Sequence, residues 1–261
     1  MVALKCYLQE KVFMSAVTQT KLFLAATTAA ILLLTACSSA SKKPPPELKH
    51  IRVLPVTPID RLYTENRSVP VGVLWQAIAD RAKSSDFNER MSATRVAVAP
   101  RLTKALEREL QAQGFEVSVL EGVPRPAGDP DDVDYARLPG REPVLHVYFS
   151  EMGMLSSRLN FDYLPKINVG AALITPGDDD YFYKERIYYG VEAGAPDESW
   201  SVPSDPRFKW PSFDALVDKP EMVVESYEAG VDALAVRIAK NVKALAGKSA
   251  LAATPASTGT D

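Results

Sequence analysis

Histidine chemistry is limited in this 261-residue chain, because His50 and His146 are its only imidazoles. A histidine can act as a general base or as a metal ligand, and both roles need partners at a suitable spacing. His146 alternates with Tyr148 and Ser150 in strand-like sequence, which places the three side chains on one face. The pattern favours a hydrogen-bonded structural histidine over a catalytic or ligating one.

Recognisable catalytic motifs are missing from the sequence. It contains no G-x-G-x-x-G, no Walker sequence, no H-E-x-x-H and no G-x-S-x-G. Two acidic runs, Asp129–Asp134 and Asp178–Asp180, lack the spacing, the central glycine and the closing glutamate of a calcium-binding EF-hand loop. We therefore expect no enzyme activity, no cofactor and no metal site, and we interpret the acidic runs as solvated loop charges.

The clearest chemical group is the thiol of Cys37, which closes the segment KLFLAATTAAILLLTAC that begins at Lys21. A cationic residue, an apolar run and small residues before a cleavage point are the parts of a secretory signal. The apolar run is shorter than the roughly 20 residues that span a bilayer, which argues against a transmembrane helix. Its end, LTAC, resembles a bacterial lipobox.

This resemblance implies cleavage before Cys37 and acylation of the cysteine by a diacylglyceryl group and fatty acids such as palmitate. Residues 1–36 are then a signal peptide, with Met14 as a possible true start, and residues 37–47 form a lipidated, proline-rich tether. Ser38 follows the cysteine in place of aspartate, and by the lipoprotein sorting pattern this favours the periplasmic side of the outer membrane over the inner membrane.

Composition excludes several classes of partner. Removing residues 1–36 takes three lysines and one glutamate from 30 basic and 33 acidic residues, which leaves a net charge of −5. An acidic domain argues against nucleic-acid binding and against electrostatic docking on an anionic bilayer. Cys6 lies in the removed segment and Cys37 carries lipid, so we expect neither a disulfide nor a cysteine nucleophile in the mature domain.

Two segments carry more functional groups than a connector requires. One loop contains Arg61 and Tyr63, and a proline-rich region contains Trp200, Phe208 and Trp210. Aromatic side chains and arginine are the usual anchors of protein interfaces. The same side chains could instead form an internal ion-pair network or cover a sheet edge. We take the five residues as candidate partner-binding residues.

Hydrophobic periodicity predicts the elements that must position these side chains. The expected strands are His50–Val56, Phe115–Leu120, Val144–Met152, Ile167–Thr175 and Tyr181–Val191. The expected helices are Val71–Lys83, Met91–Gln113 with its continuous part beginning near Ala99 because of Pro100, and a helix that starts around Pro220 and ends at Gly247.

The long segment 121–142, rich in proline, glycine and aspartate, is expected to be a surface loop, and residues 248–261 a disordered tail. Residues 48–247 then form a single α+β domain. We expect one mostly antiparallel sheet with helices packed on one face.

The segments RLTKAL at 101–106 and QGFEV at 113–117 place a helix that ends in glycine before a strand. With the anchor and tether, they resemble envelope lipoproteins with a TolB amino-terminal-like domain, some of which are auxiliary lipoproteins of transport systems. The resemblance implies a non-catalytic assembly role. We therefore expect a lipid-anchored envelope protein that binds or scaffolds an envelope protein partner. The alternatives are a small-molecule or lipid binding module, with its site between sheet and helices, and, with least support, an envelope hydrolase.

Overall fold

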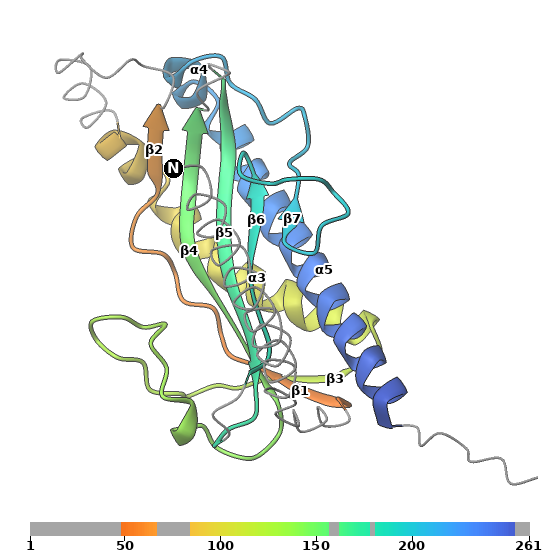
Figure 1. Ribbon diagram of the computed structural model, residues 1–261. Helices are drawn as coiled ribbons and strands as arrows, with labels where there is room; N and C mark the ends of the chain where they lie inside the picture. The colour runs from red at the N-terminus through yellow and green to blue at the C-terminus, as the bar shows by residue number, and fades with distance from the viewer. Residues whose placement is uncertain (1–47, 67–83, 157–161, 178–180, 254–261) are drawn as a thin grey trace, which may run out of the picture. The chain divides into compact units, whose positions relative to one another are not determined.

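Seven strands form one sheet in the order β3-β1-β4-β5-β6-β7, with β2 pairing to β4 (Figure 1). The computed structural model describes residues 48–66, 84–156, 162–177 and 181–253, which all belong to one compact unit. The strands are β1 (His50–Val53), β2 (Tyr63–Asn66), β3 (Glu116–Val119), β4 (Val144–Ser156), β5 (Tyr163–Ile174), β6 (Tyr181–Gly190) and β7 (Ser201–Val202).

The three long strands β4, β5 and β6 form an antiparallel meander at the centre of the sheet, as their alternating sequences predict. Gly177, with φ of +81°, lies in the turn between β5 and β6, where a left-handed backbone favours glycine. The short strands add at the edges in parallel: β1 and β2 pair with the two ends of β4, β3 with β1, and β7 with β6. Counted by paired residues, the sheet is mostly antiparallel, because the two antiparallel pairings are much longer than the four parallel ones.

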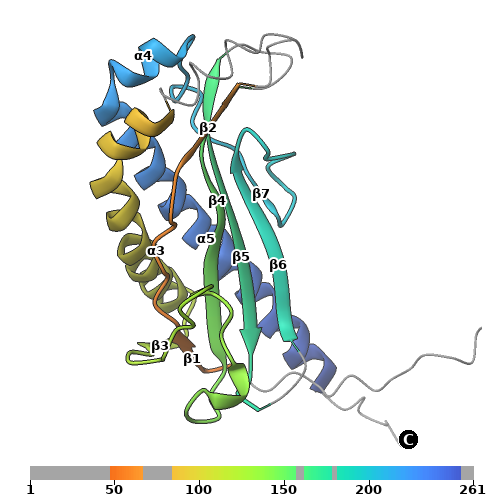
Figure 2. The same cartoon turned by 90° about the vertical axis from the view of Figure 1, so that its left-hand side faces the viewer.

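Helices cover one face of this sheet (Figure 2). They are α3 (Ser92–Ala112), the short α4 (Phe213–Val217) and the long α5 (Pro220–Ala253). Apolar residues of α5 recur every three or four positions and are fully buried, at 0% exposure: Tyr227, Val231, Leu234, Ile238 and Val242. They join α3 and the inner face of β4–β6 in the main core, so the expected single α+β domain with helices on one face is confirmed.

Two predicted helix boundaries are wrong. The helix α3 does not begin near Ala99, because it runs from Ser92 with Pro100 inside it. Pro100 has no N–H to donate to the carbonyl of Val96, four residues earlier. Both residues are exposed, so water can replace the missing hydrogen bond. The helix α5 continues past Gly247 to Ala253, since one glycine costs only about 1 kcal/mol relative to alanine and good helix formers follow it.

The segment 121–142 is more than the surface loop expected from its composition. It contains the short 3-10 helix η1 (Tyr135–Arg137) and buries Val133 and Leu138 against strand residues of β4 and β5. Val144 and Ile174 from these strands pair in register and complete this second, smaller core. Because side chains alternate along a strand, Val144 faces away from the helices while its neighbour Leu145 lies in the main core. The segment therefore caps one end of the face that none of the described helices covers, which we call the helix-free face.

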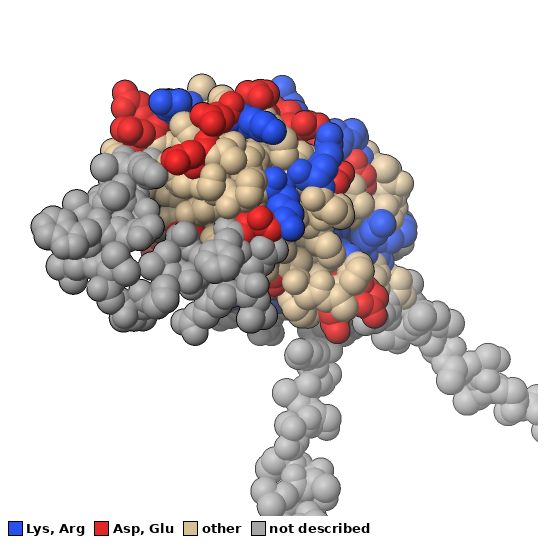
Figure 3. Space-filling model, turned by 90° about the horizontal axis from the view of Figure 1, so that it is seen from above, with Lys and Arg blue, Asp and Glu red and all other residues tan. Residues whose placement is uncertain are grey.

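Several predicted segments lie outside the described residues: the signal peptide, the tether and the helix at 71–83. Within the described ranges, none of the helices combines the length and the apolar character that membrane crossing requires. Acidic and basic side chains are interspersed over the described surface in the view from above (Figure 3), in keeping with the small net charge.

Candidate binding groove on the helix-free face of the sheet

The helix-free face of β4–β6 is hollowed by a groove of about 370 Å³. Its floor is the backbone of β5 at Gly170 and Ala172, and its walls include Tyr148, Lys184 and Arg186 from the neighbouring strands. The Tyr148 ring lies against Gly170 so closely that a Cβ at this position would overlap the ring. Glycine at position 170 is therefore what allows the tyrosine to lie across β5 and form a wall.

A chain of aromatic rings runs along one end of the groove. The ring centroids of Tyr135 and His146 are 5.8 Å apart, and those of Tyr135 and Tyr181 are 6.2 Å apart, both in edge-to-face geometry. His146 and Tyr148 follow at 5.3 Å, and the Lys184 Nζ lies 4.4 Å from the centroid of the Tyr181 ring. Rigid rings and one cation thus line this end.

His146 is the buried member of this cluster, at 0% exposure. Its Nδ1 lies 2.8 Å from the Tyr135 hydroxyl, and burial raises the pKa of that hydroxyl to about 12. Its Nε2 lies 3.9 Å from Asp131, whose carboxylate accepts a hydrogen bond of 2.5 Å from Thr57. These contacts tie the segment 121–142 to the sheet, which agrees with the structural role predicted for this histidine.

Lys184 and Arg186 on β6 form the wall of the groove on the solvent-exposed side. Lys184 and Arg186 are exposed, and within the described part of the chain neither makes an ion pair. Arg101 on α3, by contrast, is paired with Glu228 at 3.1 Å and with Asp232 at 2.7 Å. An anionic group could therefore approach the β6 cations without breaking an existing salt bridge.

A second polar cluster lies farther along the same face. Lys166 on β5 is only 7% exposed, and its Nζ contacts Glu151 at 2.6 Å and Glu192 at 2.9 Å. The amide of Asn168 donates to both carboxylates as well, at 3.1 and 2.7 Å. Burial alone would lower the pKa of Lys166, but the hydrogen bonds and charges of the two glutamates outweigh it and raise this pKa.

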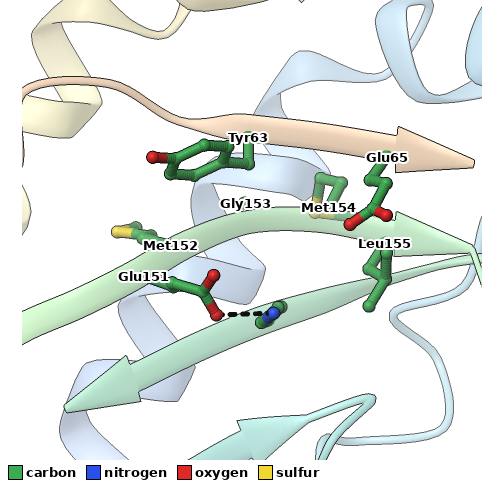
Figure 4. A pocket seen from close by; sticks show the side chains of 8 residues that line it. Tyr63, Glu65, Glu151, Met152, Gly153, Met154 and Leu155 are labelled. Carbon is green, nitrogen blue, oxygen red and sulfur yellow. Dashed lines mark ion pairs between the residues drawn. The ribbon is translucent and has the colours of Figure 1, made fainter.

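A small pocket beside this cluster includes Tyr63, one of the predicted binding residues (Figure 4). Tyr63 and Glu65 lie on β2, next to β4, which carries Glu151. Arg61 lies over the Tyr63 ring, 4.7 Å from its centroid, and donates a 3.2 Å hydrogen bond to its hydroxyl. With a volume of about 40 Å³ the pocket is too small for more than a few water molecules.

The aromatic residues predicted in the proline-rich region are mostly internal. Phe208 and Trp210 are 0% and 1% exposed and belong to the main core, so no partner can reach them. Trp210 also anchors the region by backbone hydrogen bonds to Tyr163 of β5. Trp200 is half-buried and packs edge-to-face on Tyr188, with ring centroids 5.9 Å apart. The prediction of an aromatic docking surface is wrong for Phe208 and Trp210, because these side chains complete the core.

The other predicted sites are placed as follows. The space between sheet and helices, expected for the alternative ligand site, is filled by the main core. His50 lies on the surface with Nδ1 3.1 Å from Glu116. Among the described residues, no group of His, Cys, Asp or Glu is arranged to hold a metal ion. Cys37 lies outside the described residues.

Sequence reasoning missed the groove residues. Strand alternation places Tyr148 on one face of β4, and the same rule applies to Lys184 and Arg186 on β6. It does not show that Gly170 leaves room beneath Tyr148, because that depends on the pairing register of β4 and β5. No sequence pattern marks Tyr135 as a groove residue, since the path of the segment 121–142 is what brings it to His146.

Comparisons with known proteins give only loose likenesses. No family model and no curated protein matches the chain. A solved Xanthomonas campestris protein of family DUF330 has 9% identity and a TM-score of 0.39, over 80% of this chain and 94% of that one. An Acinetobacter baumannii minor lipoprotein has 10% identity and a TM-score of 0.32, over 76% and 94%. The Neisseria meningitidis lipoprotein GNA1162 has 18% identity and a TM-score of 0.25, over 56% and 87%. Scores this low transfer neither fold nor function, and the TolB-like resemblance is not shown.

Proposed function

We propose that this chain is a lipid-anchored, non-enzymatic envelope protein whose helix-free sheet face binds a protein partner. The observation that carries the proposal is the wall of the groove, where two exposed cations, without an ion pair to any described residue, lie beside aromatic rings. Aromatic and arginine side chains around a concave site are the usual anchors of an interface. On the helical side, by contrast, Arg101 is already paired with acids of α5.

Site-specific photo-crosslinking in living cells tests this face. A photoreactive residue at Lys184 should capture a discrete protein, whereas one at Lys104, an exposed lysine on α3, should not. The two positions are matched in residue type and exposure class but belong to different sides of the sheet. The same adducts at both positions, or adducts at Lys104 alone, would contradict the proposed face.

The anchor has a separate test. The Cys37→Ala protein should leave the membrane fraction and appear in the soluble periplasmic fraction, because stable anchoring requires the acyl chains. Density-gradient fractions of the unaltered protein should coincide with outer-membrane markers. Retention of the Cys37→Ala protein on membranes would show that something other than the lipid holds it there.

A small-molecule site is the second candidate, and the volume of the groove favours it. At about 370 Å³ it falls in the range of known ligand pockets, roughly 300–1,000 Å³. Native mass spectrometry of the purified protein should then show a bound molecule that the Gly170→Val protein lacks. Identical spectra for the two proteins, each without a ligand, would remove this candidate and leave the protein-binding proposal unaffected.

A further inference from the structure

Among the described residues, only β7 pairs with the outer edge of β6, and it does so along part of the length of β6. The Tyr188 N–H points away from β5, because it donates a 2.8 Å hydrogen bond to the Trp200 carbonyl next to β7. In an antiparallel strand, successive residues alternately direct their N–H and C=O groups towards one neighbour and away from it. Lys184 and Arg186 therefore also direct these groups outwards. Within the described residues no hydrogen bond occupies them.

The strand β7 covers only the far part of this edge. Its register pairs Ser201 with Tyr188 and Val202 with Tyr189. The preceding loop meets β6 once more, where the Ser199 hydroxyl donates to the Glu185 side chain. An added segment must therefore end before Tyr188, and the edge available to it is Tyr181–Arg186. These six residues match the usual strand length of about 5–6 residues, and their register against β5 shifts once, between Tyr181 and Tyr183.

The side chains on this edge determine which segment fits. Open edges usually carry charges that discourage unspecific pairing, and Lys184 and Arg186 serve that role here. Both lie on the groove face of β6, opposite Ala172 and Gly170 of β5. A strand added to β6 would place alternate side chains about 5 Å from theirs, Cβ to Cβ. Acidic side chains at those positions would be stabilised there, and basic ones would be repelled.

We propose that the partner of this protein docks by strand addition. An extended acidic segment hydrogen-bonds to the β6 edge at Tyr181–Arg186 and directs its carboxylates to Lys184 and Arg186. The inference rests on the proposed function, because it states how the helix-free side takes its protein partner. Main-chain hydrogen bonds supply affinity in this mode of recognition, and alternate side chains supply specificity.

A defined peptide tests the geometry on the mature, full-length protein in detergent. The probe is an eight-residue peptide in which glutamate alternates with valine, and its binding is measured by fluorescence anisotropy. Two matched controls are the same peptide with lysine for glutamate and the same peptide N-methylated at alternate residues. The glutamate peptide should bind, and both controls should lose about tenfold or more in affinity, as should Lys184→Glu and Arg186→Glu proteins. Equal binding of the N-methylated peptide, or of the lysine peptide, would overturn strand addition by an acidic segment.

Amide hydrogen exchange separates this inference from the proposed function. The Arg186 amide should exchange rapidly in the free protein and become protected in the partner complex that is crosslinked through position 184. The amides of Glu185 and Ile187, which face β5, should be protected in both states. A specific crosslinked partner without protection at Arg186 would leave the function standing and refute the strand addition. Protection that appears with protein concentration alone would mean that a second copy occupies the edge, which also refutes it.

Discussion

Replacing Lys166 by methionine tests the buried ion-pair cluster that supports the helix-free face. The substitution removes an ammonium group that lies 2.6 and 2.9 Å from two carboxylates and leaves Glu151 and Glu192 close together. Breaking a buried ion pair by removing one partner typically costs about 3–5 kcal/mol. The Glu151 side chain is 48% exposed, so water partly screens it, and we expect the lower end, about 3 kcal/mol.

The assay is urea unfolding at neutral pH followed by tryptophan fluorescence, with Lys209→Met as the matched control. Lys209 contacts Asp162 at the same 2.6 Å, but its side chain is 50% exposed. Exposed ion pairs contribute about 0–1 kcal/mol, so the control should stay within about 1 kcal/mol of the unaltered protein. Equal losses for the two variants, or a Lys166→Met protein as stable as the unaltered one, would refute the reasoning.

The pH dependence of this cluster has a definite sign. Because the folded-state pKa of Lys166 is raised, its contribution to stability is fully present below the ordinary pKa of lysine. The contribution is lost as the pH rises through the raised pKa. The difference in unfolding free energy between the unaltered protein and Lys166→Met should therefore narrow in strongly alkaline buffer. A constant difference across that range would show that lost packing, and not charge, causes the destabilisation.

Three further expectations follow from the same geometry. Gly170→Val should displace the Tyr148 ring, which lowers the unfolding free energy by about 1–3 kcal/mol and abolishes crosslinking at Lys184. Urea unfolding measures the first effect and the crosslink yield the second. An unchanged yield would contradict the role of the groove. Trp210→Ala should lower the unfolding free energy by about 3–5 kcal/mol, because the ring is fully buried, and a stable protein with selectively lost partner binding would contradict its assignment to the core. Burial raises the pKa of Tyr135 to about 12, so ultraviolet absorbance should show this hydroxyl ionising at a higher pH than exposed tyrosines. The stability that Tyr135 contributes should therefore decline as the pH rises from about 10 towards 12.

The sequence predicted the parts of the fold that repeat a simple period. Alternation found β4, β5 and β6, and apolar residues at steps of three and four found α5 together with its start at Pro220. The predictions that depended on single residues were weaker. Pro100 and Gly247 are common helix breakers, but a solvent-exposed proline and one glycine cost less than the packing of a long helix provides.

The candidate site was harder to predict, because it depends on contacts between distant segments. Trp210 and Phe208 have the composition of an interface, yet burial depends on the path of the chain, which places them in the core. The groove needs a glycine on β5 opposite a tyrosine on β4, and the register between the strands decides that pairing. The contact of Tyr135 with His146 needs the fold of a long irregular segment, for which local sequence provides no period.

Hydrogen exchange on the captured partner complex tests the central claim most directly. If the partner binds the helix-free face, amide protection should increase along β4–β6 around Tyr148 and Lys184, while exposed residues of α3 such as Lys104 keep the exchange rates of the free protein. Protection confined to the outer surface of α3 and α5, with unchanged rates along β6, would contradict the account.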